Sequence, residues 1–251
     1  MNTFVSPTDE DLSGRIILVT GAAGGLGSSA AKACGSLQAT VILLDKDVAG
    51  LEKVYDDIVE SGAPLPAIYP FDLESATEKH YHELAETISN QYGIIHGLFH
   101  CAAHCPALGP ISDLETKSWA KVLNVNLNAP FLLTQVLLPL MSKAKDASIV
   151  FVSDSSARKS NAYWGAYAVS KIGLEGFAKI LAEEFQTAGK IRVNTLIPGP
   201  INSAIRQRAY PGEDSSELPL PESLDKVVCY LLGLASKGIT GQVISSDYLR
   251  V

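Results

Sequence analysis

The sequence is poor in the features that mark secreted, nucleic-acid-binding and membrane proteins. It has four cysteines in 251 residues, and its start carries Asp9, Glu10 and Asp11 where a secretory signal would be apolar. We therefore expect reduced thiols and a cytoplasmic location. The formal net charge is −7, without the basic surface that nucleic acid requires. No apolar run of membrane-spanning length is evident, so we expect no membrane partner either.

A metal site is also not expected. The residue types that bind zinc occur together at His100, Cys101, His104 and Cys105, but no second cluster of His and Cys exists in the chain. Contiguous residues cannot easily surround a tetrahedral ion, so we predict no metal ligands.

Strand-like and helix-like segments alternate along the chain, and 47% of the residues are hydrophobic. The predicted strands are 15–20, 40–45, 66–70, 95–101, 147–153, 191–197 and 242–247. The predicted helices are 25–36, 48–61, 76–91, 116–144, 166–187 and 222–235. This alternation predicts an α/β fold of Rossmann type, a doubly wound, seven-stranded parallel sheet with helices on both faces. We expect residues 1–251 to form a single domain, whose ligands bind after the carboxyl ends of the strands.

The glycine-rich run 20–27, with the sequence TGAAGGLG, follows an apolar strand and opens a small-residue helix. Gly21 suits a tight turn, Gly25 lets the backbone approach a pyrophosphate, and Gly27 lets the helix pack on the strand. In that context the run predicts a dinucleotide site, although an ordinary loop has similar composition.

The second predicted strand ends at Asp45. A carboxylate at this place accepts the adenosine ribose hydroxyls and repels a ribose 2′-phosphate, so we predict NAD in preference to NADP. The adjacent Lys46 gives some tolerance for the phosphate, and a helix-capping role for Asp45 is the simpler alternative.

Tyr167 and Lys171 lie four residues apart in a helical pattern and so share one face. An ammonium group beside a phenol lowers the phenol pKa, which suits proton exchange with an alcohol or a carbonyl. Alone, such a pair is more typical of an ordinary amphipathic helix.

Together these motifs resemble the short-chain dehydrogenase/reductase family along nearly the whole chain. The family's glycine pattern matches 20–27, its Tyr-x-x-x-Lys pair matches Tyr167 and Lys171, and its helix Asn matches Asn126. Its Asn-x-x-x-Pro-Gly segment matches 194–199. The resemblance implies that Tyr167 is the general acid/base, that Lys171 holds the nicotinamide ribose, and that Asn126 holds a water in a proton relay.

The resemblance also implies a cofactor-binding set and a homodimer or homotetramer. The implied cofactor residues are Gly21, Gly25, Leu26, Gly27, Asp45, Asp72, Leu73, Cys101, Tyr167, Lys171, Pro198, Gly199 and Ser203.

The chain departs from the family at the position of the usual catalytic Ser, where it has Asp154. An ionised carboxylate cannot donate a hydrogen bond, and its charge opposes a neighbouring tyrosinate. Three explanations are open: Ser155 takes over after a one-residue shift, Asp154 stays protonated, or the activity is weakened, lost or redirected. The Ser155 shift is favoured because loops absorb such offsets, so both residues are candidate catalytic groups.

A second departure is Cys101 and Ala103 in a loop where the family commonly has Asn and Gly, which implies a repacked loop.

We predict an oxidoreductase that transfers a hydride between NAD(H) and a secondary alcohol or carbonyl compound, with a substrate lid at about 200–220. The alternative is a weakly active or non-catalytic dinucleotide-binding sensor or scaffold. Reduction of a carrier-linked ketone is a third possibility, suggested only by general family usage.

Overall fold

The chain folds around one parallel sheet of seven strands in the order β3-β2-β1-β4-β5-β6-β7. The computed structural model describes residues 6–246. The strands are β1 (Ile16–Thr20), β2 (Thr40–Asp45), β3 (Ala67–Pro70), β4 (Gly97–His100), β5 (Ala147–Val152), β6 (Ile191–Ile197) and β7 (Val243–Ser245). Every residue of β5 and β6 is buried, as expected for central strands that are covered on both faces. The predicted fold class is confirmed.

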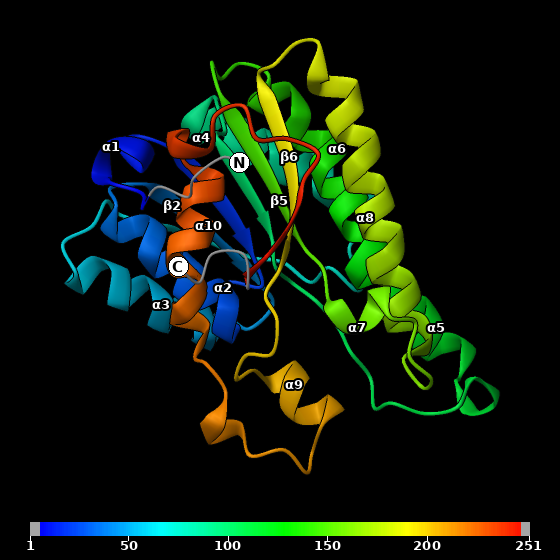
Figure 1. Ribbon diagram of the computed structural model, residues 1–251. Helices are drawn as coiled ribbons and strands as arrows, with labels where there is room; N and C mark the ends of the chain where they lie inside the picture. Colours follow the sequence, from blue (N-terminus) through cyan, green and yellow to red (C-terminus); the bar gives the residue numbers. More distant parts are fainter. Residues whose placement is uncertain (1–5, 247–251) are drawn as a thin grey trace.

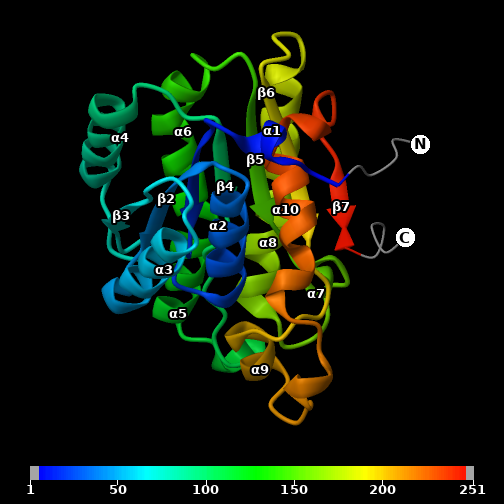
Figure 2. The same ribbon diagram turned by 90° about the vertical axis from the view of Figure 1, so that its left-hand side faces the viewer.

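Helices cover both faces of the sheet (Figures 1 and 2). On one face, α2 (Gly25–Ser36), α3 (Val48–Glu60) and α10 (Asp225–Leu232) pack in a core with Val19, Leu43 and Val150. On the other, α4 (Glu78–Tyr92), α6 (Ala129–Met141) and α8 (Gly165–Gln186) pack in a core with Leu18, Leu98 and Ile149. The alternation of side chains along each strand supplies both cores at once.

The structure also contains short helical segments, which are α1 (Asp9–Leu12), α7 (Ser155–Arg158), α9 (Ala204–Ala209), η1 (Ile111–Asp113), η3 (Ser215–Glu217), η4 (Pro221–Leu224) and η5 (Leu234–Ser236). The sequence analysis assigned 222–235 to one helix, but η4, α10 and η5 divide that range. The separate short helices were not predicted, because segments of three to six residues are too short to show a hydrophobic period.

The predicted strand 95–101 is too long, since β4 spans only Gly97–His100. After it the backbone leaves the sheet, and the Cys101 amide donates to the side chain of Thr20. Other predicted element ends differ from the structure by up to three residues, and the end of the predicted strand 242–247 at Asp247 lies outside the described residues.

The predicted helix 116–144 consists of α5 (Thr116–Leu123), the π-helical segment η2 (Asn124–Asn128) and α6 in direct succession. By length and hydropathy the combined run Thr116–Met141 could cross a bilayer, so the expectation that no such run exists is wrong. In this fold Leu133, Leu137 and Met141 are fully buried in the core, and a core helix passes the same test.

Candidate active site

A cavity of about 610 Å³ opens at the carboxyl ends of the strands. It brings together the residues that the sequence analysis assigned to cofactor and catalysis, with one exception. The lining includes Gly21, Gly25, Leu26, Gly27, Asp45, Asp72, Leu73, Cys101, Asp154, Ser155, Tyr167, Lys171, Pro198, Gly199 and Ser203. Asn126 is fully buried and does not line the cavity. Residues from six strand ends thus meet as a parallel sheet requires.

The glycine-rich turn between β1 and α2 forms one wall. Gly21 has a φ of +69°, and a Cβ there would lie 2.8 Å from Cα of Ala102. A Cβ on Gly27 would collide with the carbonyl oxygen of Gly21, whereas one on Gly25 would meet only Cγ of Pro221 at 3.4 Å. The tight path of the turn therefore requires glycine at positions 21 and 27. At Gly25 the backbone is accessible from the cavity.

Thr20 holds the facing loop against this turn. Its Oγ1 accepts hydrogen bonds from the amides of Cys101 and Ala102, each at 3.1 Å. These two hydrogen bonds tie the start of the loop after β4 to the end of β1. Burial raises the pKa of the Cys101 thiol to about 12. The thiol therefore stays protonated and unreactive near neutral pH.

Asp45 is tied to its neighbouring backbone. Its Oδ2 accepts from the Ala23 amide at 3.2 Å and its Oδ1 from the Asp47 amide at 3.1 Å. Lys46 Nζ points away toward Glu74, whose Oε2 lies 3.9 Å from it and 2.8 Å from Lys121 Nζ. Two carboxylates, Asp45 and Glu74, and the two lysines thus all line the cavity.

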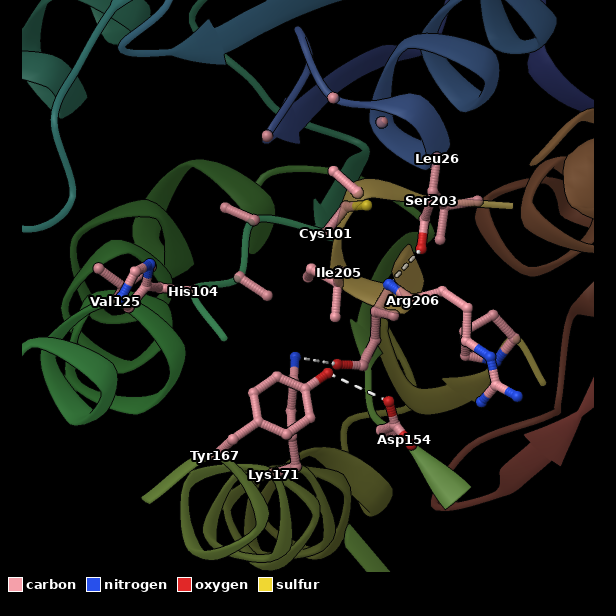
Figure 3. Close-up of a pocket in the computed structure, with 18 of the residues that line it drawn as sticks. Leu26, Cys101, His104, Val125, Asp154, Tyr167, Lys171, Ser203, Ile205 and Arg206 are labelled. Carbon is pink, nitrogen blue, oxygen red and sulfur yellow. Dashed lines mark hydrogen bonds between the residues drawn. The ribbon is translucent and has the colours of Figure 1, made fainter. Parts of the chain in front are cut away.

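Tyr167 and Lys171 rise from α8 toward the cavity, and the Asp154 carboxylate faces them from the end of β5 (Figure 3). The Tyr167 hydroxyl donates to Oδ2 of Asp154 at 3.2 Å. Lys171 Nζ donates to the Val152 carbonyl at 2.7 Å. Tyr167 is 3% exposed and Lys171 is 2% exposed, so neither is a solvated surface group.

The surroundings fix the proton on Tyr167. Burial, with the adjacent negative charge of Asp154, raises the pKa of Tyr167 well above its ordinary value. Burial lowers the pKa of Lys171, and Asp154 opposes that shift. The lowering of the Tyr167 pKa that we expected from Lys171 is therefore wrong for this site, because desolvation and Asp154 outweigh the ammonium.

The serines beside Asp154 do not replace it. Ser153 is buried and its hydroxyl donates to Glu175 at 2.6 Å. Ser155 is exposed, and within residues 6–246 its hydroxyl makes no hydrogen bond to Tyr167. The one-residue shift favoured from the sequence does not occur, because the Ser156 amide donates to Oδ1 of Asp154 at 2.7 Å and fixes the turn.

Asn126 acts behind the wall of the cavity, in η2. Its Oδ1 accepts from the His104 amide at 2.7 Å, and its Nδ2 donates to the His104 carbonyl and to Ser170 Oγ, both at 3.0 Å. The side chain thereby joins the β4 loop to α8. These contacts fix the backbone at His104, and the role of Asn126 in a proton relay stays a prediction.

The segment after β6 lines the cavity through residues of α9 and its flanks, and it contacts Trp164 before α8. Trp164 packs between Tyr167 and Tyr210, with ring centroids 5.6 and 6.0 Å away. Arg206 stacks on Tyr210 and pairs with Glu213, and Arg208 donates to the Cys105 carbonyl at 2.8 Å. Both arginines are thus engaged within the protein. Ser203 Oγ accepts from the Arg206 amide at 3.2 Å and caps α9 (Figure 3).

This wall fits a nicotinamide dinucleotide. The glycine turn offers bare backbone and the start of a helix, whose first N–H groups favour an anion. Asp45 at the end of β2 and Asp72 after β3 also line the cavity, as do Tyr167 and Lys171 of α8. Across residues 6–246 no group of three or more His, Cys, Asp or Glu could hold a metal ion.

Sequence reasoning missed four contributors to the site: Val152, His104, Ser170 and Glu175. Val152 and His104 act through backbone atoms, which no side-chain pattern reveals. Ser170 and Glu175 do lie three and eight residues after Tyr167, so helical spacing could have indicated their face.

Comparison with known proteins gives matches along nearly the whole chain. A family model described as short chain dehydrogenase matches residues 15–214. An uncharacterized oxidoreductase of Escherichia coli K12, YciK, is 38% identical over 96% of this chain and 95% of its own. A short-chain dehydrogenase structure from Pseudomonas syringae is 41% identical, with a TM-score of 0.94 and coverage of 97% and 99% of the two chains. An E. coli CFT073 structure complexed with NADPH is 38% identical, with a TM-score of 0.92 and coverage of 96% and 100%.

Proposed function

Since the chain belongs to the short-chain dehydrogenase/reductase family of oxidoreductases, we propose that it transfers a hydride between a nicotinamide cofactor and a secondary alcohol or carbonyl compound. The observation that carries this proposal is the meeting of the Tyr167 hydroxyl, Lys171 and the glycine turn in one cavity. When bound, the nicotinamide supplies or accepts the hydride.

In this proposal the chain's own residues bind and orient the reactants and move one proton. The glycine turn and Asp45 hold the dinucleotide, and Lys171 fixes the end of β5 through the Val152 carbonyl. Trp164 and Tyr210 exclude water from the mouth. Tyr167 exchanges a proton with the substrate oxygen. Burial and the adjacent Asp154 raise the pKa of Tyr167, so its hydroxyl carries the proton that carbonyl reduction requires.

The test is NADH- and NADPH-dependent reduction of a panel of ketones and aldehydes, with Tyr167→Phe as the control. We expect Tyr167→Phe to lower kcat/KM by roughly 100-fold or more, as for loss of a general acid, while its thermal unfolding stays close to native. Equal activity in the two proteins would contradict the assignment of Tyr167.

A second candidate is a dinucleotide-binding sensor or scaffold, and one observation favours it. The carboxylate of Asp154 occupies the side of Tyr167 from which a hydroxyl would polarise a carbonyl. This candidate predicts NADH binding by fluorescence without turnover of any carbonyl, and it predicts that Asp154→Ser gains activity.

For the cofactor we propose NAD(H) as the preferred form. The similar E. coli structure holds NADPH, which supports a nicotinamide cofactor and favours the phosphorylated form. In this chain, however, the Asp45 carboxylate lines the cavity and opposes a ribose phosphate. Lys46 and Lys121, which face Glu74, lessen that opposition.

We expect the ratio of kcat/KM for NADH over NADPH to exceed one. Asp45→Ser is expected to shift this ratio toward NADPH by about tenfold or more, since it removes a like charge. A native preference for NADPH that Asp45→Ser leaves unchanged would contradict the role of Asp45.

We further propose that residues 1–251 form a single domain, with 200–220 as its substrate lid, and that the protein works in the cytoplasm. A homodimer or homotetramer would cover the apolar side chains that α6 and α8 expose, Phe131, Val169, Ile172 and Ile180. Sedimentation at micromolar concentration tests the assembly, and a monomer would contradict it.

A further inference from the structure

The carboxylate of Asp154 is placed where the substrate must bind. It extends from the end of β5 toward Tyr167, and both residues line the cavity (Figure 3). Its Oδ2 accepts a hydrogen bond from the Tyr167 hydroxyl at 3.2 Å, and its Oδ1 accepts one from the Ser156 amide at 2.7 Å. Any compound whose oxygen reaches the Tyr167 hydroxyl therefore also lies beside a carboxylate.

The segment that carries Asp154 is clamped on both sides. Glu175 of α8 accepts from the Ser153 hydroxyl at 2.6 Å and from Arg158 Nε at 2.9 Å. Ser153 precedes Asp154, and Arg158 ends α7, which begins directly after it. These contacts tie the segment on either side of Asp154 to α8.

Asp154 has no cationic partner among residues 6–246 within ion-pair distance. Lys171, the buried cation nearest to this chemistry, donates instead to the Val152 carbonyl. An ionised carboxylate accepts hydrogen bonds and donates none. It has more lone pairs than its two donors, the Tyr167 hydroxyl and the Ser156 amide, use. It can therefore accept a further hydrogen bond from a ligand in the cavity.

Binding of a carbonyl compound changes which hydrogen bonds Asp154 accepts. To donate to the carbonyl oxygen, the Tyr167 hydroxyl has to turn its proton away from Asp154. A simple ketone offers no replacement donor and brings its own lone pairs toward the carboxylate. A compound with a hydroxyl on the adjacent carbon restores the lost hydrogen bond. Its two oxygens lie about one hydrogen-bond length apart, which matches the 3.2 Å between Tyr167 Oη and Asp154 Oδ2.

From this geometry, and resting on the proposed function, we propose that Asp154 selects substrates with a hydroxyl on the carbon next to the reacting one. The substrate class is α-hydroxyketones in reduction and vicinal diols in oxidation. A neutral hydroxyl suits the site better than an ammonium group, because the Lys171 ammonium is buried close by.

The electron balance is that of the family reaction. In reduction the C=O double bond becomes C–O as the carbon gains a hydride from NADH, and its oxygen takes the Tyr167 proton. The tyrosinate regains a proton from solvent. The neighbouring hydroxyl donates a hydrogen bond to Asp154 throughout and is not itself oxidised or reduced.

The test compares matched ketones with and without the neighbouring hydroxyl: acetoin with butanone, and α-hydroxycyclohexanone with cyclohexanone. In the native protein we expect kcat/KM to favour each hydroxyketone by about 10-fold or more, as for one hydrogen bond to a charged group. Asp154→Ser should bring each ratio close to one, mainly by raising activity on the simple ketone.

Asp154→Asn is the matched second variant, because it keeps the size of the side chain and removes its charge. It too should reduce the ratios, and thermal unfolding shows whether each variant folds. Tyr167→Phe should lower kcat/KM for both ketones of a pair alike, which separates selection by Asp154 from proton transfer by Tyr167.

Ratios near one in the native protein, or ratios that both Asp154 variants leave unchanged, would overturn the selection by Asp154 while the proposed function stands. Turnover by Asp154→Ser alone would overturn it as well, in favour of a sensor. If neither the native protein nor any variant oxidises NADH with the four ketones, both the selection and the proposed function fail.

Discussion

At the scale of single residues, burial decides the protonation of the groups around the cavity. His100 is fully buried, stacks on Phe151 with ring centroids 4.7 Å apart, and meets Thr134 Oγ1 through Nε2 at 2.9 Å. Burial, helped by Lys171, lowers the pKa of His100 to about 3. The His100 imidazole is therefore neutral in the folded state. In the unfolded chain it takes up a proton near its usual pKa.

This difference predicts a loss of stability in acid. Between about pH 6.5 and pH 3 the unfolded state binds the proton and the folded state does not, so stability falls as the pH falls. We expect His100 to contribute a decrease of about 1.4 kcal/mol in the free energy of unfolding per pH unit below about pH 6.5. Urea unfolding at several pH values measures it. His100→Gln should remove that part of the slope, and an unchanged slope would show that His100 is not responsible.

At the scale of elements, two glycines of the β1–α2 turn differ in whether the path of the backbone requires them. Gly21 is needed for the path of the chain, because of its positive φ and the backbone of Ala102 beside it. Gly25 begins α2, and a Cβ there would make only an ordinary contact with Cγ of Pro221, at 3.4 Å. We therefore expect Gly21 to serve the fold and Gly25 to serve the approach of a ligand to the backbone.

The two roles predict opposite results for Gly21→Ala and Gly25→Ala. Gly21→Ala should lower the free energy of unfolding by about 2 kcal/mol or more, since a left-handed alanine alone costs about 1–2 kcal/mol. Gly25→Ala should leave stability within about 1 kcal/mol of native and weaken NADH binding. Chemical unfolding and NADH fluorescence titration measure the two effects. Equal destabilisation by both substitutions would contradict this division.

At the scale of the whole molecule, a buried ionic network joins the ends of the strands opposite the cavity. Asp146, just before β5, pairs with Arg192 of β6 at 3.0 Å and with Arg15, just before β1, at 3.2 Å. Arg192 also donates to the carbonyls of Leu231 and Gly233 at 3.1 and 2.8 Å. The network thereby fixes α10 to the sheet, and α10 packs against α2 of the glycine turn.

Loss of the central carboxylate should affect the whole fold. Asp146→Ala leaves two buried guanidinium groups without their counter-charge, so we expect a loss of about 3–5 kcal/mol in the free energy of unfolding. Asp57→Ala is the matched control, because its pair with Lys32 is 3.3 Å long but well exposed. That substitution should cost less than about 1 kcal/mol. A similar small cost for Asp146→Ala would mean that the network adds little to stability.

The fold class and most of the residues that line the candidate site could be predicted from local patterns in the chain. Apolar strand runs, turn glycines and the spacing of Tyr167 and Lys171 are local patterns, and a parallel sheet gathers whatever follows its strands at one edge. This is why residues as distant as Gly21, Asp45 and Tyr167 were correctly expected in one place. The catalytic roles of these residues stay predictions.

The side-chain contacts and the protonation of the site could not be predicted in this way. The tertiary structure put Asp154 instead of Ser155 against Tyr167, turned Asn126 toward the backbone of His104, and raised the Tyr167 pKa that the sequence led us to expect lowered. Each outcome depends on burial and on which polar atoms meet across elements. Desolvation and hydrogen bonding act over a few ångströms in space, and spacing along the chain does not record those distances.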